Sequence, residues 1–82
     1  MILKITDSTD NTETIVKVMM VEREENSSEF KVWDYCDNMA TIYAKDELDA
    51  KYCIQKLYSN NRAEINAEIE WDNEWWKNSI VV

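Results

Sequence analysis

The sequence contains no histidine, no glycine and no proline. Without histidine, the chain lacks the side chain that most often moves protons near neutral pH and that serves as the base beside a serine or cysteine nucleophile. Without glycine, it lacks the loops whose backbone approaches a bound phosphate closely. These absences exclude most enzyme motifs. The sequence therefore predicts a protein that is not an enzyme and needs no cofactor.

Cysteine is also scarce, since only Cys36 and Cys53 are present. Two cysteines do not make a disulfide framework, and their spacing fits no zinc motif. We interpret both as buried thiols, with a single disulfide between them as the alternative. The polar stretch that begins at Asp7 is not a calcium loop, because its sixth position is not glycine and its twelfth is not a carboxylate. No metal site is predicted.

Long apolar runs are missing as well. None approaches the roughly 20 residues that cross a bilayer, and the apolar start at residues 1–5 is too short for a signal peptide. We expect a soluble, cytoplasmic protein. Its 82 residues, of which 45% are hydrophobic, show no linker and no internal repeat, so residues 1–82 are interpreted as a single domain.

Negative charge dominates what is present. The chain has 17 acidic and 9 basic residues, for a formal net charge of -8. Such a charge repels nucleic acid and anionic membranes, because phosphate binding needs clustered lysine and arginine. The same field attracts basic protein surfaces and steers association with them. The partner we expect is a basic protein, in particular a nucleic-acid-binding one, with no direct binding to nucleic acid or membrane.

After a short β-prone start at residues 1–6, three further β-prone runs precede the middle of the chain. Residues 14–22 are apolar on both faces, which predicts a central strand covered on both sides. Residues 30–36 and 39–44 predict two further strands. Asp37 and Asn38 between them tolerate left-handed backbone angles without glycine. The pattern is typical of a three-stranded antiparallel meander.

A helix is predicted from about residue 47 to residue 58. Asp46 precedes it as an N-cap, and an asparagine in the run 59–61 supplies the left-handed residue that glycine usually provides at a helix end. The apolar side chains recur at spacings of three and four and form one stripe. They are Ala50, Cys53, Ile54 and Leu57.

Residues 63–78 fit two interpretations. Apolar and polar residues alternate from residue 63 to residue 71, which is the period of a strand. The segment is also rich in alanine and glutamate, and some of its large apolar residues fall near one helical face. A closing strand at residues 79–82 fits either interpretation. The fold class we expect is α+β: an antiparallel sheet of three to five strands with one main helix, about 47–58, packed on one face.

The most unusual segment runs from Glu64 to Trp76, where acids alternate with tryptophan and no lysine or arginine intervenes. In a strand, these acids lie on one side as far as Glu70, spaced about 6.8 Å apart, which is near the phosphate spacing of a nucleic-acid strand. One interpretation is a solvated acidic face over a core; the other is a protein-binding surface with tryptophan anchors. The candidate binding residues are Glu64, Glu68, Glu70, Trp71, Asp72, Glu74 and Trp75.

A second acidic cluster surrounds the first predicted turn and is interrupted only by Arg23. Such a turn is usually no more than solvent-exposed. If both clusters lie on one side of the domain, they form a broad negative face that competes with nucleic acid for a basic groove. The members of this cluster are Glu22, Glu24, Glu25 and Glu29.

In its size, its net negative charge and its acidic and aromatic stretch 64–76, the chain resembles the small acidic proteins with which phages inhibit host defences, of the anti-CRISPR and anti-restriction type. The resemblance implies an inhibitor that occupies the DNA- or RNA-binding surface of an effector in the host cytoplasm, and it assigns no role to single residues. The alternative is a structural or assembly module that self-associates, for example as a homodimer, and whose acidity serves solubility.

Overall fold

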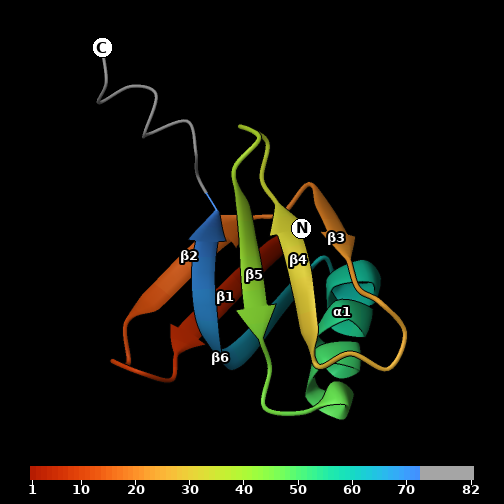
Figure 1. Cartoon of the computed structure of the whole chain (residues 1–82). Helices are drawn as coiled ribbons and strands as arrows, with labels where there is room; N and C mark the ends of the chain where they lie inside the picture. Colours follow the sequence, from red (N-terminus) through yellow and green to blue (C-terminus); the bar gives the residue numbers. More distant parts are fainter. Residues whose placement is uncertain (73–82) are drawn as a thin grey trace.

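The computed structural model describes residues 1–72, which form one sheet of six strands and one helix (Figure 1). The order of strands in the sheet is β2-β1-β6-β5-β4-β3, and α1 covers part of its inner side. The α+β class is thereby confirmed. In chain order the elements are β1 (Ile2–Asp7), β2 (Glu13–Lys17), β3 (Met20–Glu22), β4 (Glu29–Trp33), β5 (Met39–Tyr43), α1 (Glu47–Asn60) and β6 (Arg62–Asp72).

The sheet is larger than predicted and is mixed rather than antiparallel. Strands β3, β4 and β5 form the expected antiparallel meander. Strands β1 and β6 run parallel, from the pair Ile2 and Arg62 to the pair Asp7 and Ala67. The alternation of side chains shows which residues share a face but carries no information on strand direction. The expectation of an antiparallel sheet was wrong for this reason, and the expected count of three to five strands was wrong because residues 14–22 form two strands rather than one.

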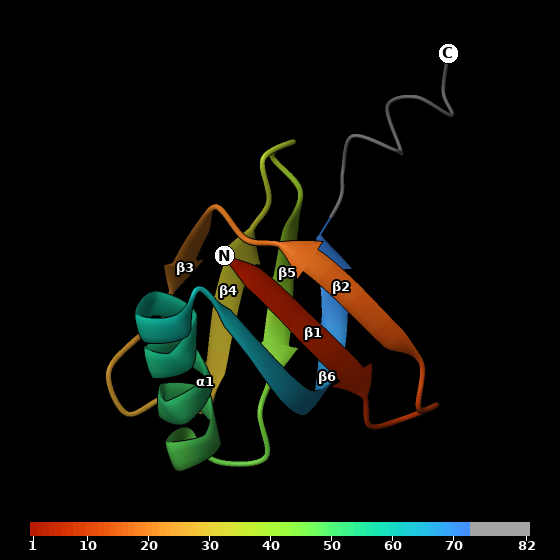
Figure 2. The same ribbon diagram turned by 180° about the vertical axis from the view of Figure 1, so that it is seen from behind.

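The run 14–22 forms two edge strands, not one central strand. Its middle is a bend, where the Val18 N–H donates to the Met1 carbonyl and the Met19 N–H donates to the Trp33 carbonyl, each over 2.7 Å. The strands β2 and β3 are therefore consecutive in the chain but lie at the two opposite edges of the sheet. The sheet is curled, and the chain passes directly from one edge to the other (Figure 2). The run is apolar on both faces because each edge strand leaves an apolar side chain outside; Ile15 is 68% exposed.

Strand β6 resolves the ambiguity of residues 63–78 in favour of a strand as far as Asp72. Residues 62–67 pair with β1, and residues 68–72 pair with β5. Figures 1 and 2 show that β6 bends between these two segments. Its first half therefore belongs to the part of the curled sheet that contains β1, and its second half to the part that contains β5. Residues 73–78, and the predicted closing strand at 79–82, lie outside the described residues.

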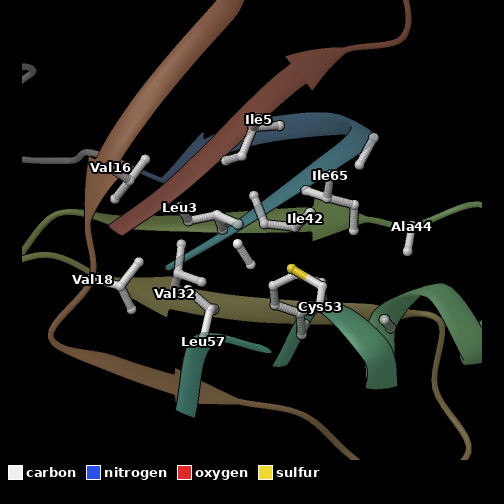
Figure 3. Close-up of a cluster of buried hydrophobic side chains, with 14 of the residues drawn as sticks. Leu3, Ile5, Val16, Val18, Val32, Ile42, Ala44, Cys53, Leu57 and Ile65 are labelled. Carbon is white, nitrogen blue, oxygen red and sulfur yellow. The ribbon is translucent and has the colours of Figure 1, made fainter. Parts of the chain in front are cut away.

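The core lies inside the curled sheet, beneath α1 (Figure 3). In β6, the alternation buries Ala63, Ile65 and Ala67. Burial of apolar side chains removes them from water and is the main stabilising contribution in a domain of this size. Other core side chains come from all the remaining elements except β3; they are Leu3, Ile5, Val16, Val18, Phe30, Val32, Ala40, Ile42, Ala44, Ala50, Cys53 and Leu57.

Within residues 1–72, asparagine and aspartate take the place of glycine wherever the backbone is left-handed. The φ angles are 61° at Asn11, 64° at Asn26, 62° at Asp37 and 62° at Asn61. Asparagine and aspartate visit this region more readily than other residues with a side chain, because their short polar groups bond to the nearby backbone. The predictions for Asp37 and for the asparagine at the helix end are confirmed.

The predicted helix is also confirmed, with two further residues at its end. The Asp46 side chain accepts a hydrogen bond of 2.8 Å from the Asp49 N–H, as an N-cap does. The apolar stripe faces the core: Ala50, Cys53 and Leu57 are buried. The spacing of apolar residues was therefore sufficient to place both the helix and its buried face.

The two cysteines are free, and only one of them is buried. Cys36 is exposed, so its interpretation as a buried thiol was wrong; it follows β4 in a loop, outside the strand predicted for 30–36. Burial raises the pKa of the Cys53 thiol from 9.0 to about 11, and the charge of Asp49 adds to the effect. The thiol of Cys53 therefore stays protonated and unreactive at neutral pH.

We expect a thiol reagent at pH 8 to label one cysteine, Cys36, in the folded protein and both cysteines in urea. The variant Cys36→Ser should show no labelling until it unfolds. Because the folded-state pKa of Cys53 lies above the ordinary value of 9.0, the unfolded chain ionises first as the pH rises. The free energy of unfolding should thus decrease above about pH 9. Equal labelling rates for both thiols in the folded protein would contradict the burial of Cys53.

Candidate functional site

The outer face of the half-sheet β3-β4-β5-β6 brings together acids that are far apart in the sequence. The register places Glu68 beside Tyr43, which is beside Glu29 on β4. Residues that pair across strands have their side chains on the same face. The next row of residues paired across the four strands has Glu70 on β6 at one end and Glu22 on β3 at the other. Both predicted acidic clusters thus contribute to one surface.

We call this surface the acidic sheet face. Its carboxylates all belong to exposed residues. Along β6 they alternate with inward residues and are about 6.8 Å apart. Neighbouring strands are about 4.8 Å apart, and β5, which separates β6 from β4, contributes no carboxylate to the face. Its acids are Glu22, Glu29, Glu68, Glu70 and Asp72.

Tyr43, at the end of β5, lies among the carboxylates of this face. The Tyr43 hydroxyl donates a hydrogen bond of 3.0 Å to Glu70 Oε2. That bond raises the pKa of Tyr43, as do the charges of Glu70, Glu29 and Glu68. One phenol therefore experiences carboxylates from two different strands, β4 and β6.

Little positive charge balances these carboxylates. The register places one cation on the face, Lys31, between Thr41 and Glu22. With five carboxylates and one ammonium group, the acidic sheet face carries a net charge of four negative units. The two ion pairs within residues 1–72 join other acids, Glu13 and Glu47, to lysines over 3.6 Å. The acidic sheet face is therefore available to an external cation.

One end of the face is apolar. The last row of the register places Asp72 beside Met39, then Trp33, then Met20. Trp33 and Met39 are half-buried, and Met20 is 44% exposed. Tryptophan and methionine are enriched in protein interfaces. Sequence analysis missed Trp33, although its alternation with Val32 places it on the same face as Lys31.

The predicted binding residues fall into four groups. Glu68, Glu70 and Asp72 lie on the acidic sheet face. Glu64 lies before the bend of β6, on its half that pairs with β1, where Lys4 is its neighbour. Trp71 follows the inward alternation of β6 and so lies on the side opposite to Glu70. The remaining two, Glu74 and Trp75, lie outside the described residues.

Trp71 lines an apolar hollow of about 330 Å³ on another part of the surface. Ile15 and Tyr35 lie beside it, each 68% exposed, and the exposed Cys36 lies at its margin. Exposed large apolar side chains that gather in one place are typical of a protein contact. This hollow therefore gives Trp71 a position separate from the acids that precede it in the sequence.

Within residues 1–72, no three acidic or cysteine side chains are arranged to hold a metal ion. The helix α1 has neither the length nor the apolar character that crossing a membrane requires. Comparisons of the chain with protein-family models, with curated proteins and with solved structures give no match.

Proposed function

We propose that this protein is a non-catalytic binding protein whose acidic sheet face docks on a basic, nucleic-acid-binding surface of a partner protein and blocks it. The observation that carries the proposal is the gathering of Glu22 and Glu29 with Glu68 and Glu70 on one face. A surface that needed acids only for solubility would not have to concentrate them around a single lysine.

The geometry supports competition with a polyanion. Along β6, outward carboxylates repeat about every 6.8 Å, near the distance between successive phosphates along one nucleic-acid strand. Glu29 on β4 and Glu22 on β3 add one carboxylate each, and β5 between β4 and β6 adds none. The apolar row around Trp33 at the end of the face offers an anchor inside a polar surround, as binding hot spots do. Of the binding residues predicted from the sequence, Glu68, Glu70 and Asp72 are at the centre of this proposal. Glu64 and Trp71 lie on other parts of the surface and are not part of the acidic sheet face.

The resemblance to phage-encoded anti-CRISPR and anti-restriction inhibitors supports a nucleic-acid-binding effector of the host as the partner, met in the host cytoplasm. An inhibitor of this kind needs no reaction of its own. It needs only to bind the basic groove more tightly than nucleic acid does at the salt concentration of the cell.

The experiment is capture followed by competition. The immobilised protein should retain a basic protein from host extract at about 0.1 M salt and release it at about 1 M, because salt screens charge attraction. The captured protein, once identified and purified, should bind a fluorescent oligonucleotide that the free inhibitor displaces. Retention that does not depend on salt, or an oligonucleotide that stays bound at saturating inhibitor, would refute the proposal.

The apolar hollow beside Trp71 favours a second candidate function, self-association. Ile15 belongs to β2, which is an edge strand of the sheet formed by residues 1–72, and Tyr35 belongs to the loop after β4. Exposed strand edges and apolar patches are common sites of homodimerisation. Sedimentation equilibrium separates the two functions: a stable dimer that Tyr35→Ser converts to monomer supports self-association.

A further inference from the structure

Within the described residues 1–72, the first half of β6 has a strand edge that no other strand covers. Residues 62–67 pair with β1 on one edge only. On the other edge, pairing with β5 begins at Glu68, after the bend. Within residues 1–72, no strand pairs with this second edge between Arg62 and Asn66.

The hydrogen bonds to β1 show which backbone groups the open edge presents. The Asn61 carbonyl accepts from the Ile2 N–H over 3.0 Å, and the Ala67 carbonyl accepts from the Ser8 N–H over 3.1 Å. Backbone groups of successive residues point to opposite edges of a strand, so the odd-numbered residues face β1. The even-numbered residues Arg62, Glu64 and Asn66 therefore turn their N–H and carbonyl groups to the open edge, as a template for another strand.

The helix leaves room along this edge. A hollow of about 580 Å³ lies between α1 and the start of β6, within the size range of binding sites. Figure 2 shows α1 on the side of this half of β6 that is away from β1. The hollow is lined by Tyr52, Cys53, Lys56, Asn60, Arg62, Ala63 and Glu64.

The charges in the hollow differ from those of the acidic sheet face. Two cations, Lys56 and Arg62, line it together with one acid, Glu64. Neither cation takes part in an ion pair within residues 1–72. The Lys56 ammonium lies 4.9 Å from the centre of the Tyr52 ring, a cation–π contact that holds it at the mouth of the hollow. A carboxylate in an occupying segment would find two unpaired positive partners here.

We propose that the open edge of β6 binds an extended, acidic peptide segment of a partner protein by β-strand addition. The backbone groups of Arg62, Glu64 and Asn66 pair with the added strand, and Lys56 and Arg62 bind its carboxylate. Main-chain hydrogen bonds supply affinity in this mode of recognition, and side-chain pockets supply selectivity. The proposal goes beyond the function proposed above, since it concerns another surface and a ligand of opposite charge.

The test uses a displayed library of random peptides of about twelve residues, selected on the whole protein. Selected peptides should combine alternating β-branched residues with aspartate or glutamate. The variant Glu64→Pro should weaken their binding at least about tenfold, because it removes an N–H that the added strand needs but β1 does not. The matched variant Glu64→Thr keeps that N–H and should stay within about threefold.

Two further measurements test the proposal even if the Glu64→Pro variant does not fold. Peptide binding to the unaltered protein should slow hydrogen exchange at the amides of Arg62, Glu64 and Asn66. The variant Arg62→Glu should weaken acidic peptides about tenfold. A library that yields no binder, or binders that protect other amides and tolerate Glu64→Pro, would overturn the proposal. Glutamine at both Glu68 and Glu70 should leave peptide affinity unchanged, which separates this outcome from a failure of the acidic sheet face.

Discussion

Reversing the charge of Glu68 and Glu70 to lysine is expected to weaken binding of the captured basic partner about a hundredfold at low salt. Both carboxylates lie on the acidic sheet face, and both are exposed. Each exposed ion pair contributes up to about 1 kcal/mol, and reversal replaces attraction by repulsion of similar size. The loss should arise largely in the association rate and should shrink as salt is added, because long-range attraction steers the encounter. Surface plasmon resonance at several salt concentrations measures both effects.

A charge-matched control distinguishes a shaped surface from simple net charge. Glu24 and Glu25 are exposed in the turn between β3 and β4, outside the rows of the face. The variants E68Q/E70Q and E24Q/E25Q carry the same net charge. Only E68Q/E70Q should elute clearly earlier than the unaltered protein from an anion-exchange column and bind the partner more weakly. Equal losses from both would mean that total charge, rather than the acidic sheet face, determines binding.

Replacing Phe30 by alanine is expected to unfold most of the protein. Phe30 is only 1% exposed and is the largest of the fully buried side chains. Truncation of a buried phenylalanine costs about 3–5 kcal/mol, which approaches the whole stability of a small domain, on the order of 5 kcal/mol. Circular dichroism during urea unfolding should show a transition that has moved close to zero denaturant.

The control for this prediction is another aromatic residue with little packing. Tyr35 is 68% exposed, and Tyr35→Ala should change the free energy of unfolding by less than about 1 kcal/mol. If Phe30→Ala instead kept a urea midpoint close to that of the unaltered protein, the position of Phe30 in the core would be wrong.

Local patterns predicted the local structure. The stripe from Ala50 to Leu57, with Asp46 before it and Asn61 after it, identified the helix because helix periodicity and caps are encoded over a few residues. The alternation of residues 63–71 fitted the inward face of β6, but the sequence left a helix open as the alternative. The prediction of one central strand at residues 14–22 was wrong because the bend in this run depends on hydrogen bonds to Met1 and Trp33, which are distant in the sequence.

The candidate site depended on information of another kind. The sequence shows two acidic clusters, but only the register of β3, β4, β5 and β6 determines whether they share a face. A shift of one residue would have turned Glu68 and Glu70 inward. The bend of β6 separated Glu64 from these acids, and no local pattern in this segment indicates such a bend. The position of Trp71 opposite Glu70 followed from alternation alone and was available from the sequence.

The parallel pairing of β1 with β6 has a consequence for synthesis on the ribosome. Ile2 can pair with Arg62 only after sixty further residues have been synthesised. The pairing of β1 with β6 is complete only when Ala67 has also left the ribosome. Until then β1 can pair only with β2, and a lone hairpin is marginally stable in water. The nascent chain thus gains its cooperative structure late, in a single step that closes a long loop, and folding should be slow for a domain of this length.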